Sequence, residues 1–265
     1  YSPLAKALTP LAEGVTPNGQ KLTMSVITAT VAQYGGYVEL SDVLLLTAID
    51  NNLVQATDLL ASQAGRTLDT ITREVLQGGT NVYFCGGILA RASLHYTSAA
   101  SNCNITIDDV RKAVRALKIQ NAPKINGYYV GIIHPDVAYD LMSDPKWVNV
   151  KTYSDPDGIY EGEIGKIEGV RFVETTEAKV FKEAGSSSRD VYGTLILGKN
   201  AYGVTEVNGG GLQHIVKQLG SAGTADPLNQ RATVGWKAIK VAERLVELYM
   251  IRVESTSSFN DAPSN

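Results

Sequence analysis

His134 is the residue whose position most suggests acid–base chemistry. It directly follows the apolar run from Tyr128 to Ile133, and α/β enzymes place catalytic groups where buried strands end. A base needs a nucleophile to act on, yet the chain contains no GxSxG motif, and Ser143-Asp144 is explained more simply as a helix end. Two interpretations stay open: a soluble α/β enzyme with His134 as its base, or, as we favour, a hydrogen-bonded histidine at a strand–helix junction.

Residue types that bind metals or phosphates are present, but their spacing is not that of a known site. Cys85 and Cys103 are not part of a CxxC motif, and His95 is the only plausible further zinc ligand near them. The glycines at 209–211 lack the following lysine–serine or lysine–threonine pair of a phosphate loop. The acidic segment 154–163 could offer oxygens to Ca²⁺, but its spacing is not that of an EF-hand, and a solvated turn is simpler. We therefore expect no metal and no cofactor.

Three arginines suggest binding rather than catalysis. Arg66, Arg73 and Arg91 lie on or just after the longest amphipathic run of the chain. The planar guanidinium suits ion pairs at interfaces better than the lysine ammonium does. These arginines could meet carboxylates of a neighbouring copy, but an ordinary solvated helix face is the interpretation that we favour from the pattern alone.

Length and composition limit the classes of protein to which the chain can belong. The chain has 265 residues, enough for a sizeable core in one or two domains, and a formal net charge of -3. That charge favours loose, nonspecific contact with DNA over a basic lining. No run approaches a transmembrane segment in length. The chain opens at Tyr1 without a methionine or a signal peptide, so we expect that an N-terminal segment was cut off or left out.

The amphipathic run from Ser41-Asp42 to Gly78-Gly79 predicts one long helix, Asp42 to Gln77. Ser41 or Asp42 offers an N-cap, and a glycine after Gln77 can adopt the left-handed conformation that ends a helix. Roughly 36 residues would span about 54 Å. Two shorter helices kinked near Gly65 are the alternative. Apolar residues recur at three-and-four spacing: Leu46, Ile49, Leu53, Ala56, Leu60, Ala64, Leu68, Ile71 and Val75.

Residues 1–40 have the pattern of a projecting arm. Pro3 and Pro10 interrupt a weak apolar pattern, Thr16-Pro17-Asn18-Gly19 predicts a turn, and residues 21–40 favour an extended conformation. The segment has too few large residues to form a core alone. We expect it to pack on the body of the protein or on a neighbouring copy.

The remainder predicts an α+β body. An irregular loop is expected at 80–104, followed by a helix with a capping box formed by Thr106 and Asp109. A long β-hairpin is expected between residues 232 and 253, before a frayed tail at 255–265. Further strands are expected at 128–133, 165–173, 191–197, 201–207 and 214–219, with a short helix after His134-Pro135.

Several motifs occur in a characteristic order: TPNGQKLT, VELSDVL, GYYVGIIHPDVAYDL, GEIGKIEGVRFVE and DPLNQRATVGWK. In this order the chain resembles the major capsid proteins of tailed bacteriophages, specifically the family typified by the large-virion-polymerase podoviruses. The resemblance covers nearly the whole chain. It implies an α+β fold of the Hong Kong ninety-seven capsid type, with an extended loop (E-loop), a long spine helix, and peripheral and axial domains.

The resemblance also implies a division into domains. Residues 1–40 would be the E-loop and the remnant of an arm, and residues 41–123 the peripheral domain with its spine helix. Residues 124–225 would form the axial domain, and residues 226–265 the hairpin of the peripheral domain with the C-terminal tail.

The function implied is that of a major capsid protein, which is not an enzyme. It would self-assemble in the cytoplasm of the bacterial host into the icosahedral head shell of the virion, enclosing packaged DNA. Its partners would be its own copies, as pentamers and hexamers, with decoration, scaffold and portal proteins as further partners. Contact with packaged dsDNA would be nonspecific, and no membrane would be involved. A decoration or scaffold protein is the alternative from the class of binding proteins. We expect seven residues at contacts between copies: Lys21, Tyr34, Arg66, Arg73, Arg91, Trp236 and Lys237.

Overall fold

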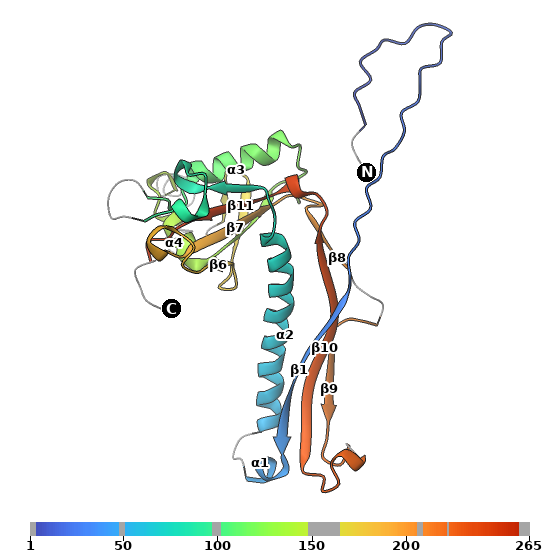
Figure 1. Cartoon of the computed structure of the whole chain (residues 1–265), viewed down its shortest axis with the longest axis vertical. Helices are drawn as coiled ribbons and strands as arrows, with labels where there is room; N and C mark the ends of the chain where they lie inside the picture. The colour runs from blue at the N-terminus through green and yellow to red at the C-terminus, as the bar shows by residue number, and fades with distance from the viewer. Residues whose placement is uncertain are drawn as a thin grey trace. The chain divides into compact units, whose positions relative to one another are not determined.

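The computed structural model describes residues 4–47, 51–96, 102–147, 165–205, 209–221 and 223–259. The chain divides into two compact units, Tyr1–Thr30, which we call the arm, and Val31–Asn265. The described helices and strands all lie in the second unit (Figure 1). They are β1 (Ala32–Ser41), α1 (Asp42–Thr47), α2 (Asn52–Gln77), β2 (Val82–Phe84), α3 (Ile107–Ile119), β3 (Tyr129–Ile133), α4 (Pro135–Met142), β4 (Lys166–Ile167), β5 (Val170–Glu174), β6 (Val180–Phe181), β7 (Val191–Leu197), β8 (Tyr202–Thr205), β9 (Gln213–Lys217), β10 (Arg231–Arg244) and β11 (Met250–Ser255).

The arm has no helix or strand in its described residues, 4–30. Its turn lies at Glu13-Gly14, where the Val15 N–H donates to the Ala12 carbonyl at 3.3 Å and Gly14 takes a φ of +76°. The turn predicted at residues 16–19 is therefore wrong. The strand predicted from residue 21 begins only at residue 32, because residues 21–30 have no strand to pair with in the described part of their own unit.

The part of the second unit that we call the spine consists of α1, α2 and a four-stranded antiparallel sheet. Strand β10 is central, with β1 on one side and β8 and β9 on the other. Alternate residues of β10 face α2, as the two-residue period of a strand requires. Val234, Trp236 and Ala238 pack there against Leu60 and Ala64.

The start of α2 corrects the prediction of one helix from Asp42 to Gln77. Ser41 does cap a helix, since its Oγ accepts from the Leu44 N–H at 3.2 Å, but α1 extends only to Thr47. Asn51 then takes a non-helical conformation (φ -78°, ψ 85°) and caps α2. Asn51 offers the backbone an alternative to the helical hydrogen bond, as asparagine readily does. The 26 residues of α2 span about 39 Å, and no break occurs at Gly65.

The end of α2 also differs from its prediction. Gly78 has a φ of -72°, so neither it nor Gly79 is left-handed. Glycine instead leaves room for side chains: a Cβ on Gly78 would lie 2.8 Å from Nη1 of Arg244, and one on Gly79 would lie 2.8 Å from Oε1 of Glu247, so either side chain would have to shift. The last carbonyls of the helix accept from the backbone N–H groups of Gly78 and Gly79 and from arginine side chains, as helix ends require.

The part that we call the body contains a seven-stranded mixed sheet in the order β2-β11-β7-β3-β5-β4, with β6 also paired to β7. Helices α3 and α4 pack on one face, in a core cluster that includes Val110, Leu117, Ile133, Leu141 and Ile196. The predicted capping box at the start of α3 is confirmed, as are the strand before His134 and the short helix after it.

The predicted hairpin of residues 232–253 is wrong, because its two strands lie in different sheets. Strand β10 belongs to the spine, whereas β11 pairs with β7 and β2 in the body. Their burial explains why the two strands belong to different sheets. The outer face of β10 is partly exposed, whereas β11 is buried throughout and needs cover on both faces. The loop predicted at 80–104 contains β2, which pairs in parallel with β11.

The tail is anchored where it was predicted to be frayed. Ser255, Thr256 and Ser257 are each fully buried. Asp140 of α4 accepts from the backbone N–H of Ser258 at 3.0 Å and from its hydroxyl at 2.5 Å. Short polar side chains can enter a core when hydrogen bonds satisfy them. Residues 260–265 lie outside the described residues.

Candidate assembly surface

An open groove on the spine brings together two of the residues expected at contacts between copies. It has a volume of about 320 Å³ and is lined by residues of β1, α2 and the loop before β6: Tyr34, Gln63, Arg66, Thr67, Thr70, Ile71 and Glu177. Tyr34 also packs against the apolar cluster between α2 and β10, and Arg66 is exposed. Tyr34 and Arg66, which come from different predicted elements, therefore share one accessible surface.

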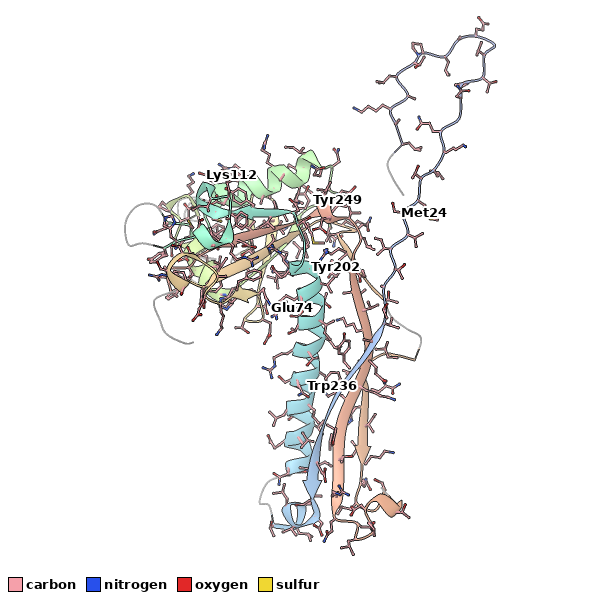
Figure 2. All side chains as sticks on the ribbon, viewed as in Figure 1. Met24, Glu74, Lys112, Tyr202, Trp236 and Tyr249 are labelled. Carbon is pink, nitrogen blue, oxygen red and sulfur yellow. The ribbon has the colours of Figure 1, made fainter. Side chains whose placement is uncertain are left out.

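Trp236 lies inside the spine and not on its surface. It is 6% exposed, and its Nε1–H donates to Oε1 of Gln63 at 3.1 Å. Figure 2 shows it between α2 and the sheet. A Cβ on Gly36 would lie 2.7 Å from the same Gln63 oxygen, so a larger residue there would displace the Gln63 side chain from this contact. Trp236 therefore holds β10 against α2 within one subunit.

Arg73 joins the spine to the body. Its Nη1 donates to the carbonyl of Glu177, and its Nη2 lies 3.1 Å from Oε1 of Glu74. Lys179 donates to both oxygens of Glu74 at 2.8 Å. Burial raises the pKa of Glu74, but hydrogen bonds from Lys179 and Arg73 outweigh it, so this pKa is lowered overall. The guanidinium of Arg73 is thus engaged inside the subunit.

Arg91 is engaged in the same way. Its Nε and Nη2 donate to the two carboxylate oxygens of Glu254, each at 2.6 Å, and its guanidinium lies 3.6 Å from the centre of the Phe181 ring. Arg252 donates to the same carboxylate at 2.7 Å. Glu254 is fully buried, so two arginines surround one desolvated carboxylate. The hydrogen bond to Glu254 raises the pKa of Arg91.

Lys21 and Lys237 complete the set. Both are exposed, Lys21 on the arm and Lys237 on the side of β10 that points away from α2. Arg73, Arg91 and Trp236 have partners in their own chain, whereas Lys21, Tyr34, Arg66 and Lys237 offer accessible side chains; contact between copies stays a proposal for all seven residues. The sequence could not separate these two groups, because an arginine has the same pattern whether its carboxylate belongs to its own chain or to a neighbour.

His134 has the structural role that the sequence favoured. It caps α4, with its Nδ1 accepting from the Asp136 N–H at 3.2 Å, and its ring centre lies 4.9 Å from that of Tyr192. The Tyr192 hydroxyl donates to Oδ2 of Asp136 at 2.7 Å. Burial lowers the pKa of His134 and raises that of Tyr192. Both side chains are therefore uncharged over the neutral range, since Tyr192 keeps its hydroxyl proton and the His134 imidazole stays neutral, and both support the fold.

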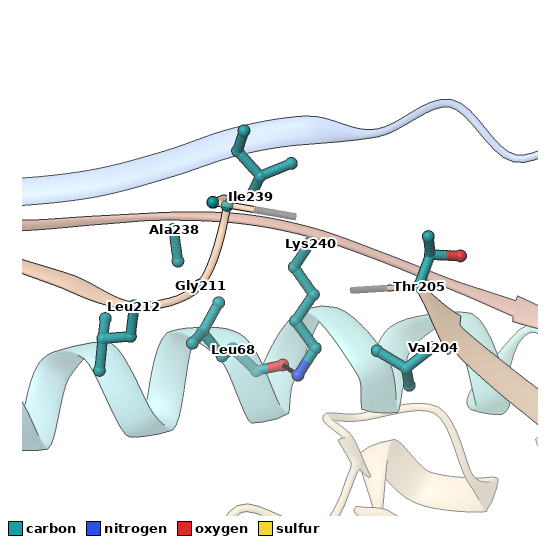
Figure 3. A pocket seen from close by; sticks show the side chains of 10 residues that line it. Leu68, Val204, Thr205, Gly211, Leu212, Ala238, Ile239 and Lys240 are labelled. Atoms are coloured by element: carbon teal, nitrogen blue, oxygen red, sulfur yellow. Dashed lines mark hydrogen bonds between the residues drawn. The ribbon is translucent and has the colours of Figure 1, made fainter. Parts of the chain in front are cut away.

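A cavity in the spine offers no catalytic constellation either. It has a volume of about 540 Å³ and lies among α2, β8, β10 and the glycines at 209–211 (Figure 3). Among the described residues that line it, Lys240 is the one titratable side chain, and its Nζ donates to the carbonyl of Leu68 at 3.0 Å. The ammonium group of Lys240 therefore has a structural role, because it satisfies the hydrogen-bonding capacity of a carbonyl in α2.

The described residues do not meet the usual requirements of a metal site or of a membrane-spanning helix. Among the described residues, no group of three His, Cys, Asp or Glu side chains could hold a metal ion. Cys85 and Cys103 are buried free thiols, and burial raises the pKa of Cys85. The acidic segment 154–163 lies outside the described residues. No described helix is long and apolar enough to cross a membrane.

A family model described as phage capsid protein matches residues 16–220. The chain belongs to this phage capsid protein family. It is a structural component of the virion, a major capsid protein of the head shell, and the alternative of a soluble α/β enzyme is wrong. No curated protein matches the chain.

Solved phage capsids have the same fold as this capsid protein. The capsid of Ralstonia phage GP4 is 14% identical with a TM-score of 0.64, over 89% of this chain and 76% of that chain. The capsid of cyanophage P-SCSP1u is 16% identical with a TM-score of 0.62, over 96% and 81%. The capsid asymmetric unit of cyanophage Pam1 is 17% identical with a TM-score of 0.62, over 94% and 83%. The prediction of an α+β Hong Kong ninety-seven capsid fold is confirmed.

Proposed function

We propose that this capsid protein self-assembles into a closed icosahedral shell of pentamers and hexamers around packaged dsDNA, with the arm of each copy lying on a neighbour. One observation carries the proposal. The arm exposes large apolar side chains along its length: Leu4, Leu8, Leu11, Val15, Leu22, Met24, Val26 and Ile27. Its own unit offers no core in which they could be buried.

The energetics favour a neighbouring copy as the partner of the arm. Full burial of one such side chain contributes about 1.5–3 kcal/mol. The described arm has few internal hydrogen bonds, such as that from the Gln20 amide to the Ala5 carbonyl at 3.0 Å, so its backbone also lacks partners. In a closed symmetric shell each subunit binds several others at once, so modest contacts add up to a stable particle.

The spine and the body suggest the domain layout. We assign the spine to the peripheral domain and the body to the axial domain. On this assignment the boundaries predicted at 41–123, 124–225 and 226–265 would change, because β2, α3 and β11 pack in the body, whereas β8 and β9 pair with β10 in the spine. Membership in the group of large-virion-polymerase podoviruses, assembly in the host cytoplasm, and decoration, scaffold and portal partners rest on the motifs of the sequence.

Removal of the arm tests the proposal. The deletion should end at Thr30, because β1 begins at Ala32 and Tyr34 packs in the spine. We expect a folded subunit that no longer forms megadalton particles, measured by size-exclusion chromatography with light scattering and by negative-stain microscopy.

A point variant keeps the length of the arm. Leu22→Ser/Met24→Ser/Val26→Ser removes three exposed apolar side chains and should abolish assembly. Thr23→Ala/Ser25→Ala changes the intervening positions and should assemble normally. Closed particles from the triple variant would show that the arm is not the assembly device.

A further inference from the structure

One end of the body concentrates basic side chains, although the whole chain has a net charge of -3. Helix α3 carries Arg111, Lys112, Arg115 and Lys118, all of them exposed (Lys112 is labelled in Figure 2). Positions 111, 115 and 118 are spaced four and three residues apart, so they share one side of the helix. The buried side of α3 carries Val110, Val114 and Leu117 instead.

Only part of this charge is neutralised within the subunit. Arg111 pairs with Asp108 at 3.0 Å and with Glu168 at 2.8 Å, and Lys112 lies 3.5 Å from Asp109. Arg115 and Lys118, by contrast, have no carboxylate partner in the described part of the chain.

A second group of cations lies at the β4–β5 hairpin. Nζ of Lys166 lies 4.9 Å from the ring centre of Tyr128, and Arg171 donates from Nη1 to the Tyr128 hydroxyl at 3.3 Å. Nζ of Lys124 lies 5.7 Å from the ring centre of Tyr129. Within the described ranges, none of these three cations forms an ion pair. Aromatic contacts position a cation without cancelling its charge.

The hairpin and α3 belong to the same end of the body. Glu168 lies in the turn between β4 and β5, and its bond to Arg111 ties that turn to the helix. The N–H of Tyr129 also donates to the carbonyl of Gly169 in this turn, at 2.9 Å. In the described part of the chain, five cations without a carboxylate partner therefore lie around one junction, which favours a positive local potential there.

The arrangement fits a phosphate backbone better than a protein partner. Protein interfaces are centred on apolar or aromatic anchors that fill pockets. The exposed side of α3 between Arg111 and Lys118 presents cations along roughly 10 Å of helix. Nonspecific DNA binding uses such distributed lysines and arginines, because the charges of the phosphates are evenly spaced.

We propose that this basic end of the body, defined by Arg115, Lys118, Lys124, Lys166 and Arg171, faces the interior of the shell and contacts the phosphates of packaged DNA. The proposal rests on the proposed function, since it requires a shell with an interior. It replaces the expectation, drawn from net charge alone, that the chain lacks a basic lining.

Salt dependence tests the contact with phosphates. The full chain, kept as unassembled subunits, is titrated into a short fluorescent DNA duplex, and binding is followed by anisotropy at several salt concentrations. Each lost phosphate contact should reduce the slope of log K against log [salt] by about 0.9. Arg115→Gln/Lys118→Gln should therefore reduce it by about 1.8.

A matched control separates local charge from total charge. Lys182→Gln/Lys217→Gln removes the same charge from exposed residues elsewhere and should leave the slope unchanged. Equal slopes for the two double variants would overturn the proposal. Loss of shell formation in Arg115→Gln/Lys118→Gln alone would also overturn it, because the basic end would then be a contact between copies.

Closed shells test the orientation. Duplex added outside closed wild-type shells should remain unbound, although unassembled subunits bind it. Binding to the outside would overturn the interior placement. If wild-type protein formed no shells, the proposed function would fail together with the orientation, while the titration of subunits would still decide whether these residues bind phosphates.

Discussion

A single substitution at the buried carboxylate of Glu254 should lower the free energy of unfolding strongly. Glu254→Gln keeps the size of the side chain and removes its charge. An amide oxygen in the place of Oε1 would keep the bonds from Nη2 of Arg91 and Nε of Arg252, but both would lose their charge assistance. Nε of Arg91 would lose its acceptor, because the amide nitrogen would replace Oε2. Arg252 cannot turn toward solvent, because its Nη1 also donates to the carbonyls of Gln77 and Gly79 at the end of α2.

The expected loss of stability follows from the burial of Glu254 beside its two arginine partners. Removal of one member of a buried ion pair typically costs about 3–5 kcal/mol, because the remaining charge stays desolvated. For a chain somewhat above 250 residues this lowers Tm by roughly 6–20 °C. Thermal unfolding of unassembled subunits, followed by far-UV circular dichroism, measures the change, and light scattering confirms that no particles are present.

Glu168→Gln is the matched control. Glu168 pairs with Arg111 at 2.8 Å, slightly longer than the bonds of 2.6 to 2.7 Å that Glu254 accepts, but both side chains are exposed. An exposed pair contributes little to stability, so Tm should stay close to that of the wild type. If both variants unfolded at the same temperature, burial would not govern the strength of these bonds, and the role assigned to Glu254 would be refuted.

Three further changes test the spine, the tail and the histidine. Leu60→Ala, at 4% exposure, should lose about 3 kcal/mol in urea unfolding, whereas the adjacent Leu59→Ala, at 70% exposure, should be nearly neutral. Asp140→Ala removes both bonds to Ser258 and should cost about 1–3 kcal/mol, with faster proteolysis of the tail. Because burial lowers the pKa of His134 below the ordinary histidine value of about 6.5, the unfolded chain takes up this proton first as the pH falls. Stability should therefore be complete above about pH 6.5 and fall below it, and His134→Asn, which keeps a cap acceptor, should flatten that dependence in unfolding measured between pH 5 and 7.5.

Local signals in the sequence predicted local structure well. Thr106 and Asp109 mark the start of α3 because capping involves residues three apart in the chain. Leu53, Ala56, Leu60, Ala64 and Leu68 mark the buried side of α2 because helical periodicity depends only on spacing. The strand before His134 and the helix after it were predicted for the same reason.

Structure that depends on distant partners was predicted poorly. Two strands near in sequence indicate a hairpin, yet β11 pairs with β7, whose place in the sheet no local pattern reveals. The glycines after α2 were assigned a left-handed turn, because Arg244 and Glu247, which approach them, lie far along the chain. Arg91 was assigned to a neighbour, although Glu254 of its own chain binds it. An unpaired cation at Arg115 could not be distinguished from a paired one at Arg111 without the fold.

The end of α2 limits where this subunit can adapt. Arg244 of β10 donates to the carbonyl of Val75 at 2.6 Å, and Arg252 of β11 donates to the carbonyl of Gly79 at 3.1 Å. The last turn of the helix is therefore bonded to both sheets, and a bend between spine and body would break several bonds together. A shell of pentamers and hexamers needs subunits that meet at different angles. That adjustment must come from the arm, which has few bonds of its own, so amide hydrogen exchange should be slow near Val75 and fast throughout the arm in unassembled subunits. Fast amide exchange at the end of α2 would contradict this expectation, because it would show that the junction between spine and body is flexible.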